Sequence, residues 1–277
     1  AGSAVYAEAD TESIVNFDGT AISRAESLNE DEASISLRSE LNSTLDVSST
    51  AEVITKVAPM QAALGIGTST NKAALTIGEN ASFETKQDVE IVSETNAESY
   101  VEAASKASRN DYFVPAIGIS MFNSDSIVNI EKTNINLDNQ KDSFTIKANN
   151  NVLGDELIAD AGITSEYEWE RIPRELKENV TALILEKAGI AGVLEVVFGG
   201  GDDPILPTKK TLANVTGAVA YGGGSHNSKI NIKPGAKIIT TGDLVLDSKT
   251  YINDTKYDST SYNYPKTEDE NDVSAKT

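Results

Sequence analysis

The stretch Leu75–Thr95 (LTIGENASFETKQDVEIVSET) decides the fold, because its pattern returns without a gap at Ile230–Thr250 (INIKPGAKIITTGDLVLDSKT). The offset between the two stretches is constant at 155 positions. Both alternate apolar and polar residues, as a β-strand does when one of its faces lies in a core. The matched apolar positions include Leu75/Ile230, Ile77/Ile232, Val89/Leu244 and Ile91/Leu246. Such a repeat predicts stacked units that bury a shared core, which is the arrangement of a solenoid.

A second repeat relates Ser13–Phe17 (SIVNF) to Ser126–Ile130 (SIVNI) at an offset of 113 positions. Four copies of one plan follow, each opening with a strand of small residues and continuing through a polar turn into further strands. The copies start near Gly2, Ala62, Pro115 and Gly217. At roughly 20–30 residues per coil the shorter spacings predict two coils each, about seven in all, and a rise of ~35 Å. The longest spacing requires an insertion.

These patterns predict an all-β fold, a right-handed parallel β-helix with one α-helical insertion, since parallel crossovers are nearly always right-handed. We expect β-helix coils over residues 1–154 and a helical insertion with its return loop over 155–210. Further coils are expected over 211–260, and an acidic, flexible tail over 261–277.

The expected insertion is where the apolar period changes from 2 to 3.6. Ser165 and Glu168 have the spacing of a capping box. An apolar helical stripe follows, formed by Ile172, Leu176, Val180 and Leu183. Trp169 and Arg171 lie beside it and are of the types that dominate binding hot spots, so they are our candidate binding residues. The alternative is that this segment only covers a face of the solenoid.

Composition excludes several classes of protein. With 23 basic and 43 acidic residues the net charge is −20, which argues against a nucleic-acid partner. The absence of cysteine excludes disulfides and thiol catalysis. The single histidine, His226, lies in a Gly/Ser/Asn stretch and is interpreted as a solvated turn residue. We expect no catalytic residues, no bound metal and no cofactor, because no nucleotide-binding motif or metal-ligand spacing occurs.

The alternating segments resemble the coil repeat of large bacterial filamentous adhesins and haemagglutinins exported by two-partner secretion. The segments that carry the resemblance are AIGIS, SIVNI, TNINL and DSFTIKA within residues 116–148, and AVAYGG, SKINI and AKIITTGDLVL within residues 218–246. The Asn/Glu/Lys-rich composition is most similar to the leukotoxin-type filamentous adhesins of fusobacteria. The resemblance implies secretion through an outer-membrane transporter to the bacterial surface or medium, and contact with a host-cell receptor or glycan.

We therefore expect a non-catalytic segment of a secreted or surface-exposed adhesin or leukotoxin. The alternative is a β-helical polysaccharide lyase or glycosidase, which requires paired carboxylates in one groove. The outward acids do not recur between copies, since Glu90 matches Val245. This mismatch favours the non-catalytic reading.

Overall fold

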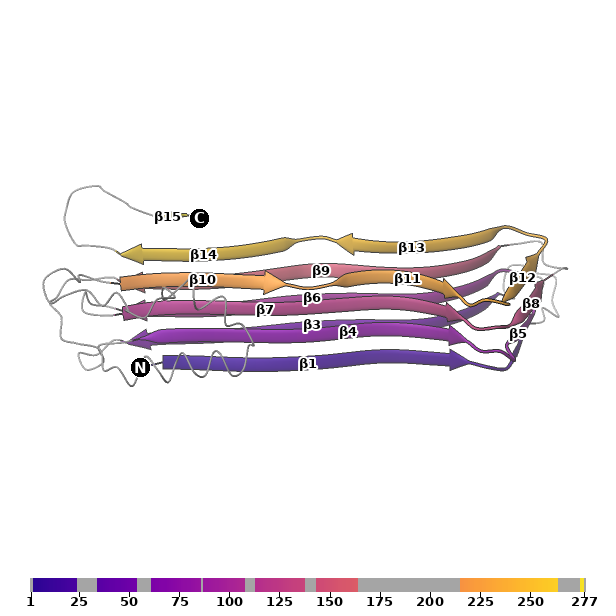
Figure 1. The fold of residues 1–277 in the computed structure, drawn as a ribbon, viewed down its shortest axis with the longest axis horizontal. Coiled ribbons are helices and arrows are strands. Elements are labelled where there is room, and N and C mark those ends of the chain that lie inside the picture. Colours follow the sequence, from indigo (N-terminus) through magenta and orange to yellow (C-terminus); the bar gives the residue numbers. More distant parts are fainter. Residues whose placement is uncertain are drawn as a thin grey trace, which may run out of the picture.

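The computed structural model describes residues 2–23, 34–53, 61–85, 87–107, 113–137, 143–163, 215–263 and 275–276. Every regular element in these ranges is a β-strand (Figure 1). The strands are β1 (Gly2–Phe17), β2 (Thr20–Ile22), β3 (Ile35–Val53), β4 (Ala62–Ile77), β5 (Ser82–Glu84), β6 (Val89–Ala107), β7 (Phe113–Ile130), β8 (Asn134–Leu137), β9 (Phe144–Ile163), β10 (Val215–Gly223), β11 (His226–Ile232), β12 (Lys237–Thr240), β13 (Leu244–Ile252), β14 (Thr255–Asn263) and β15 (Ala275–Lys276). None of the described segments is a helix that could cross a membrane.

Two long parallel sheets form the body of the molecule. The first has the order β1-β4-β7-β10, with β11 also paired to β7. The second has the order β3-β6-β9-β14, with β13 also paired to β9. Two short parallel sheets, β2-β5 and β8-β12, link the long sheets at one end (Figure 1). The fold is thus all-β with parallel sheets stacked in register, consistent with a β-solenoid.

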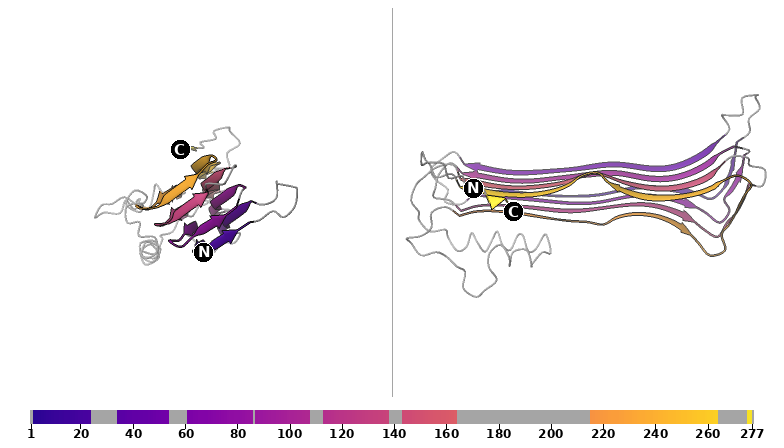
Figure 2. Two further views of the ribbon diagram at one scale, coloured as in Figure 1. Left: turned by 90° about the vertical axis from the view of Figure 1, so that its right-hand side faces the viewer. Right: turned by 90° about the horizontal axis from the view of Figure 1, so that it is seen from above.

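Each coil runs along the first sheet, turns through a short strand and returns along the second sheet (Figure 2). Four such coils stack within the part of the chain that the structure describes, since four levels of the first sheet are paired in sequence. The expectation of about seven coils was therefore wrong, and each spacing between copies is one coil. Four coils at ~4.8 Å each rise ~19 Å, about half the height expected from the sequence.

The coils are long because the polar stretch after each small-residue segment continues the strand. β1 alone runs through 16 residues without a turn. The interior beneath this stretch is itself polar, forming a seam of buried Ser, Thr and Asn side chains. The seam consists of Ser69, Asn71, Ser93, Thr95, Ser124, Ser126 and Asn150. Ser126 Oγ donates to the Ser93 carbonyl at 2.8 Å, and Asn150 Nδ2 donates to the Ser124 carbonyl at 2.8 Å, so polar residues are accommodated inside the coil.

The strand register confirms both sequence repeats and shows that they skip a coil. Leu75 pairs with Val128, which pairs with Ile230, so the copies at offset 155 lie two levels apart in one column. Ser13 likewise pairs with Ala73, which pairs with Ser126. In these two repeat stretches the first coil therefore matches the third, and the second coil matches the fourth.

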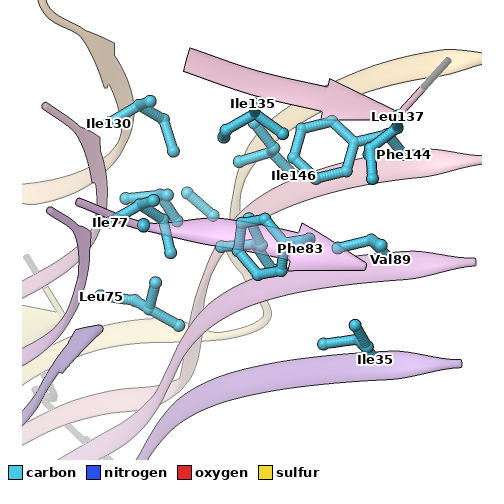
Figure 3. Close-up of a cluster of buried hydrophobic side chains, with 14 residues drawn as sticks. Ile35, Leu75, Ile77, Phe83, Val89, Ile130, Ile135, Leu137, Phe144 and Ile146 are labelled. Carbon is cyan, nitrogen blue, oxygen red and sulfur yellow. The ribbon is translucent and has the colours of Figure 1, made fainter. Parts of the chain in front are cut away.

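An apolar core fills the end of the coil near the short sheets (Figure 3). Ile77 and Ile130 are fully buried there, as the alternating pattern predicted. Aromatic rings from β1, β5 and β9 contact one another inside this core: the ring centroids of Phe17 and Phe83 lie 5.4 Å apart, and those of Phe83 and Phe144 lie 6.3 Å apart. This core orders the turn through which the chain passes from one long sheet to the other.

At the opposite end the two long sheets approach closely because small residues face inward. A Cβ atom at Gly65 would lie 2.7 Å from the Glu102 carbonyl oxygen, and one at Gly67 2.6 Å from a Val101 methyl carbon. At Gly118 it would meet Leu157 at 2.7 Å. The narrow space between the two long sheets therefore requires glycine at these positions of the small-residue segments.

The last coil is exposed on its inward face, because no described coil lies above it. Ile232, which shares a column with Ile77 and Ile130, is 43% exposed, and Leu246 is 49% exposed. The prediction that Ile232 points inward is correct in register, but the residue is not in a dry core.

The borders of the expected insertion need one correction. β9 continues to Ile163, so residues 155–163 belong to a strand because they pair with β6 and β14. The rest of the expected helical insertion lies outside the described residues. Residues 261–263 extend β14, and residues 275–276 form β15, so these parts of the expected tail are also strands.

Candidate functional site

The two binding residues predicted from the sequence, Trp169 and Arg171, lie outside the described residues. The described surface offers a different candidate contact surface. It is the outward face of the four small-residue segments, at the end of the first long sheet where β1, β4, β7 and β10 begin.

This face presents large apolar side chains, while the inward face presents Gly, Ala and Val. The row Tyr6, Ile66, Ile119 and Tyr221 is aligned across the four coils by the strand register, and we call it the apolar outer row. A parallel row runs beside it through Leu64, Ile117 and Val219. Bulk apolar residues on the outer side of a sheet mark a surface made to be covered or to contact a partner.

Burial differs along the apolar outer row. The flanking Tyr6 and Tyr221 are 46% and 42% exposed, whereas Ile66 and Ile119 between them are 2% and 1% exposed. None of the described strands lies over this face, since the second long sheet packs on its other side. The row thus combines two accessible tyrosines with a protected aliphatic centre.

A sequence signal for this row exists in the small-residue segments. AVYA, LGIG, IGIS and VAYG place a small residue inward and a large apolar one outward at alternate positions. The sequence predicts these segments only as strands of small residues. The alternation of small and large residues is visible in the sequence, but which of the two faces points inward follows from the close packing of the glycines.

A small cavity lies at a β-bulge in the second long sheet. Leu153 is the extra residue, because Ala97 pairs with Val152 and the next residue, Glu98, pairs with Gly154. The cavity has a volume of about 120 Å³ and is lined by Glu98, Ser99, Tyr100, Leu153, Gly154, Asp155, Glu156 and Asp254. It is smaller than the roughly 300–1,000 Å³ of typical ligand pockets.

Asp155 lies at the inner wall of this cavity and is 3% exposed. Its carboxylate accepts hydrogen bonds from the Tyr257 hydroxyl and from Ser120 Oγ, the latter at 3.3 Å. Burial, followed by the hydrogen bond to Asp155, raises the pKa of Tyr257 above its ordinary value. Tyr257 therefore stays protonated as a donor, and Asp155 has an internal structural partner.

His226 departs from the sequence interpretation. It is the first residue of β11, is partly buried, and points inward in register with Ser124. Its Nδ1 atom lies 2.8 Å from Ser124 Oγ, and its ring meets Phe122 edge-on with centroids 5.1 Å apart. Burial lowers the pKa of His226 against the opposing effect of Asp155 and Asp125. The residue is a neutral packing element, not a solvated turn residue, because the strand resumes directly at this position.

Charged side chains on the outer faces pair between neighbouring coils. Lys147 Nζ lies 2.7 Å from Glu90, and Arg38 Nη2 lies 2.5 Å from Glu94. Lys256 lies 2.7 Å from Glu156 in the same manner. Such exposed pairs contribute little stability individually, because water screens them. Within the described residues, no group of three or more His, Cys, Asp or Glu side chains is placed to hold a metal ion.

A scan against protein-family models and searches of curated proteins and of solved structures found no match to this chain.

Proposed function

We propose that this chain is a non-catalytic, β-helical segment of a secreted or surface-exposed bacterial adhesin or leukotoxin that contacts host cells. The observation that carries the proposal is the pair of continuous long sheets, stacked in register through four coils. Such a body presents broad, rigid outer faces, and added coils lengthen it without changing its cross-section. These properties suit a protein that displays a contact surface away from the cell that makes it.

The finer features of the architecture belong to the same proposal. A right-handed coil is supported by Figure 1, where β1, β4 and β7 run to the right in front and the returning strands run to the left behind, each later coil lying higher. A helical insertion between Ile163 and Val215 is supported by the 3.6-residue period and the capping signal there.

The partners follow from the resemblance to two-partner-secreted adhesins. An outer-membrane transporter would export the parent protein, and a host-cell receptor or glycan would be the ligand. Tyr6 and Tyr221 support a role in contact, because accessible tyrosines on a rigid sheet bind at little entropic cost. The net charge of −20 supports a partner other than nucleic acid.

The test is binding of the labelled, folded chain to host epithelial cells and leukocytes, compared with the variant Tyr6→Ala/Tyr221→Ala. We expect saturable binding that weakens at least ~10-fold in the variant, since aromatic anchors each contribute 1 kcal/mol or more. Tyr251→Ala is the matched control, because Tyr251 is 52% exposed but lies on the second long sheet. The proposal would be contradicted if the intact chain showed no saturable binding to these cells.

The alternative, a polysaccharide lyase or glycosidase, is favoured by one observation: the bulge cavity gathers the carboxylates of Glu98, Asp155, Glu156 and Asp254. Its small volume and the engagement of Asp155 by Tyr257 weigh against it. Incubating the chain with host glycans and measuring new reducing or unsaturated ends separates the two. If the chain releases such sugar ends and the Glu98→Gln variant does not, the result would favour the enzyme.

A further inference from the structure

The cavity at the β-bulge, which we call the bulge cavity, opens through the side of the solenoid. Its walls come from three successive coils, since Glu98 lies on β6, Gly154 on β9 and Asp254 in the turn between β13 and β14. Leu153, the bulged residue, is 47% exposed, so the opening faces outward from the second long sheet. Further coils on either end of the stack would lie above or below this opening and not across it.

Negative charge dominates the lining of the bulge cavity. Within the described residues, Glu156 is the lining carboxylate that has a cation, because Lys256 Nζ lies 2.7 Å from it. The other lining carboxylates form no ion pair with a described lysine or arginine. These unpaired carboxylates are Glu98, Asp155 and Asp254.

Asp155 gives a second and independent indication of a ligand, because it is a buried charge without a counter-ion. It is 3% exposed, and its carboxylate accepts hydrogen bonds from two neutral hydroxyls, those of Tyr257 and Ser120. A carboxylate has about four acceptor sites, so about two remain open on Asp155, which lines the cavity. Buried charges in proteins are normally paired with the opposite charge. The floor of the bulge cavity therefore indicates a cationic ligand.

The arrangement fits an ammonium group better than a metal ion. Within the part of the chain that the structure describes, no three carboxylate, imidazole or thiol groups are placed to hold a metal. An ammonium group needs no such convergence, because its three N–H donors point to separate acceptors. The open acceptor sites of Asp155 and the exposed carboxylates of Glu98 and Asp254 supply those acceptors. A guanidinium is a wider planar group that prefers one carboxylate in its own plane.

The size and the walls of the bulge cavity select a slender amine. Its volume of about 120 Å³ is that of about four water molecules at roughly 30 Å³ each. An ammonium group with a few methylene groups fits this space, whereas a sugar ring is too large. Tyr100 and Leu153 form the apolar part of the lining. They match the aliphatic stem of a lysine, which packs on apolar surface while its charged end meets polar groups.

The surface around the opening is also acidic. Burial raises the pKa of Tyr100, and the carboxylates of Glu102, Glu156 and Asp46 raise it further. The Tyr100 hydroxyl donates a hydrogen bond to Glu102 Oε2 at 3.3 Å. A partner with several positive charges is attracted to such a face. A lysine-bearing polypeptide supplies both this attraction and the inserting ammonium group.

We propose that the bulge cavity binds the ammonium group of a lysine side chain presented by a partner polypeptide. The ammonium group donates to Asp155 at the floor and to Glu98 or Asp254 at the rim. The lysine stem lies against Tyr100 and Leu153. This site is on the opposite long sheet from the apolar outer row, so it does not rest on the proposed function.

The test is titration of a capped Gly-Gly-Lys-Gly-Gly peptide into the isotope-labelled chain, followed by NMR. We expect saturable shifts of the backbone amide signals of Ser99 and Gly154, which line the cavity. Glu98→Gln with Asp254→Asn should weaken binding about tenfold or more, because hydrogen bonds to charged groups are lost. Glu52→Gln is the matched control and should leave binding unchanged. It removes an exposed carboxylate from the same sheet, near the end of β3.

Changes to the peptide test the same claim on the native chain, whatever the variants do to folding. Acetylating the lysine Nε removes the charge and should abolish the shifts, and arginine in its place should bind more weakly. Equal binding of the lysine and acetyl-lysine peptides would overturn the proposal. So would equal binding of the peptide by the native chain and by Glu98→Gln with Asp254→Asn.

Small cations distinguish a lysine from other sources of positive charge. If spermidine, glucosamine or calcium ions shift the cavity signals and the lysine peptide does not, the assignment to a lysine side chain is wrong. None of these measurements involves host cells. Failure of the amine site and failure of host-cell contact are therefore separate results.

Discussion

The hydroxyl of Tyr257 in the last coil donates a hydrogen bond to the buried carboxylate of Asp155 in the coil below. The same tyrosine ring fills the space above Gly222, where an added Cβ would lie 2.5 Å from its Cζ atom. One side chain thus joins the second long sheet to the first at the fourth level of the stack.

Removing this hydroxyl should destabilise the fold. Tyr257→Phe leaves Asp155 with the Ser120 hydroxyl as its partner and should lower the free energy of unfolding by about 1–3 kcal/mol. A double-mutant cycle with Asp155→Asn, measured by urea unfolding, isolates the pair. Additive losses would show that the two side chains do not interact in solution.

Position within the stack should decide the effect of an inward charge. Ile77→Asp leaves an unpaired carboxylate in a fully buried site and should cost several kcal/mol. Thr76→Asp, on the outer face of the same strand, should cost on the order of 0.5 kcal/mol or less. Ile232→Asp should be mild in the monomer, since Ile232 is 43% exposed. Thermal melting at low protein concentration measures all three, and equal losses for Ile77 and Thr76 would contradict the register.

Close approach of the sheets should forbid side chains at the inward glycines. Gly65→Ala places a methyl group 2.7 Å from a backbone carbonyl oxygen, so we expect a loss of about 1–3 kcal/mol from overpacking. Gly217→Ala is the matched control, because nothing lies within 4 Å of its added Cβ. The control should be neutral or slightly stabilising. Chemical unfolding that ranks the two variants the other way would refute the close packing.

The repeat and its register could be predicted from the sequence, because Leu, Ile, Val and Phe recur at most inward positions near the short sheets, while most of the outward positions between them are polar. The number of coils could not be predicted from the sequence. Ala9, Thr11 and Ser13 face inward on β1 but are small or polar, and the segment was interpreted as a turn. The buried polar seam makes the middle of each strand look like a surface loop, so one long strand was counted as two.

The candidate contact surface was missed for a related reason. The sequence shows that Gly65 and Gly67 are small, but the direction in which Ile66 points between them depends on the distance between the two long sheets. Only the close packing of the glycines shows that the bulky residue must point outward. Trp169 and Arg171 remain predictions.

Acid should weaken the fold in part through His226. Its pKa in the folded state is lowered by burial, so the unfolded chain binds the proton more readily. The stability that depends on neutral His226 is present above the unfolded pKa of about 6.5 and is lost as pH falls below it. His226→Gln should therefore show a shallower loss of unfolding free energy between about pH 7 and 5. Parallel profiles for the two proteins would exclude this contribution.

The segment from residue 164 to 203 should cover only the buried centre of the apolar outer row, Ile66 and Ile119, and leave Tyr6 and Tyr221 accessible. The chain leaves the described strands at Ile163 and returns at Val215, six positions before Tyr221 of that row. Deleting residues 164–203 should lower the melting temperature and increase the binding of an apolar dye. Ile66→Ser with Ile119→Ser in the deleted chain should reverse the gain in dye binding.

Cell binding distinguishes a cover from a contact module. If the segment is a cover, binding per folded molecule should be unchanged by the deletion and by Trp169→Ala with Arg171→Ala. Selective loss of cell binding in the folded double variant would instead assign these two residues to the contact surface.

The alternation of the two repeat stretches sets how such a chain can lengthen by gene duplication. Copying one coil would place two identical versions of one repeat stretch in contact, an arrangement that no level of this stack contains. Copying an adjacent pair recreates only contacts that already exist. The pair of coils is therefore the smallest unit by which the protein can grow without a new interface having to evolve.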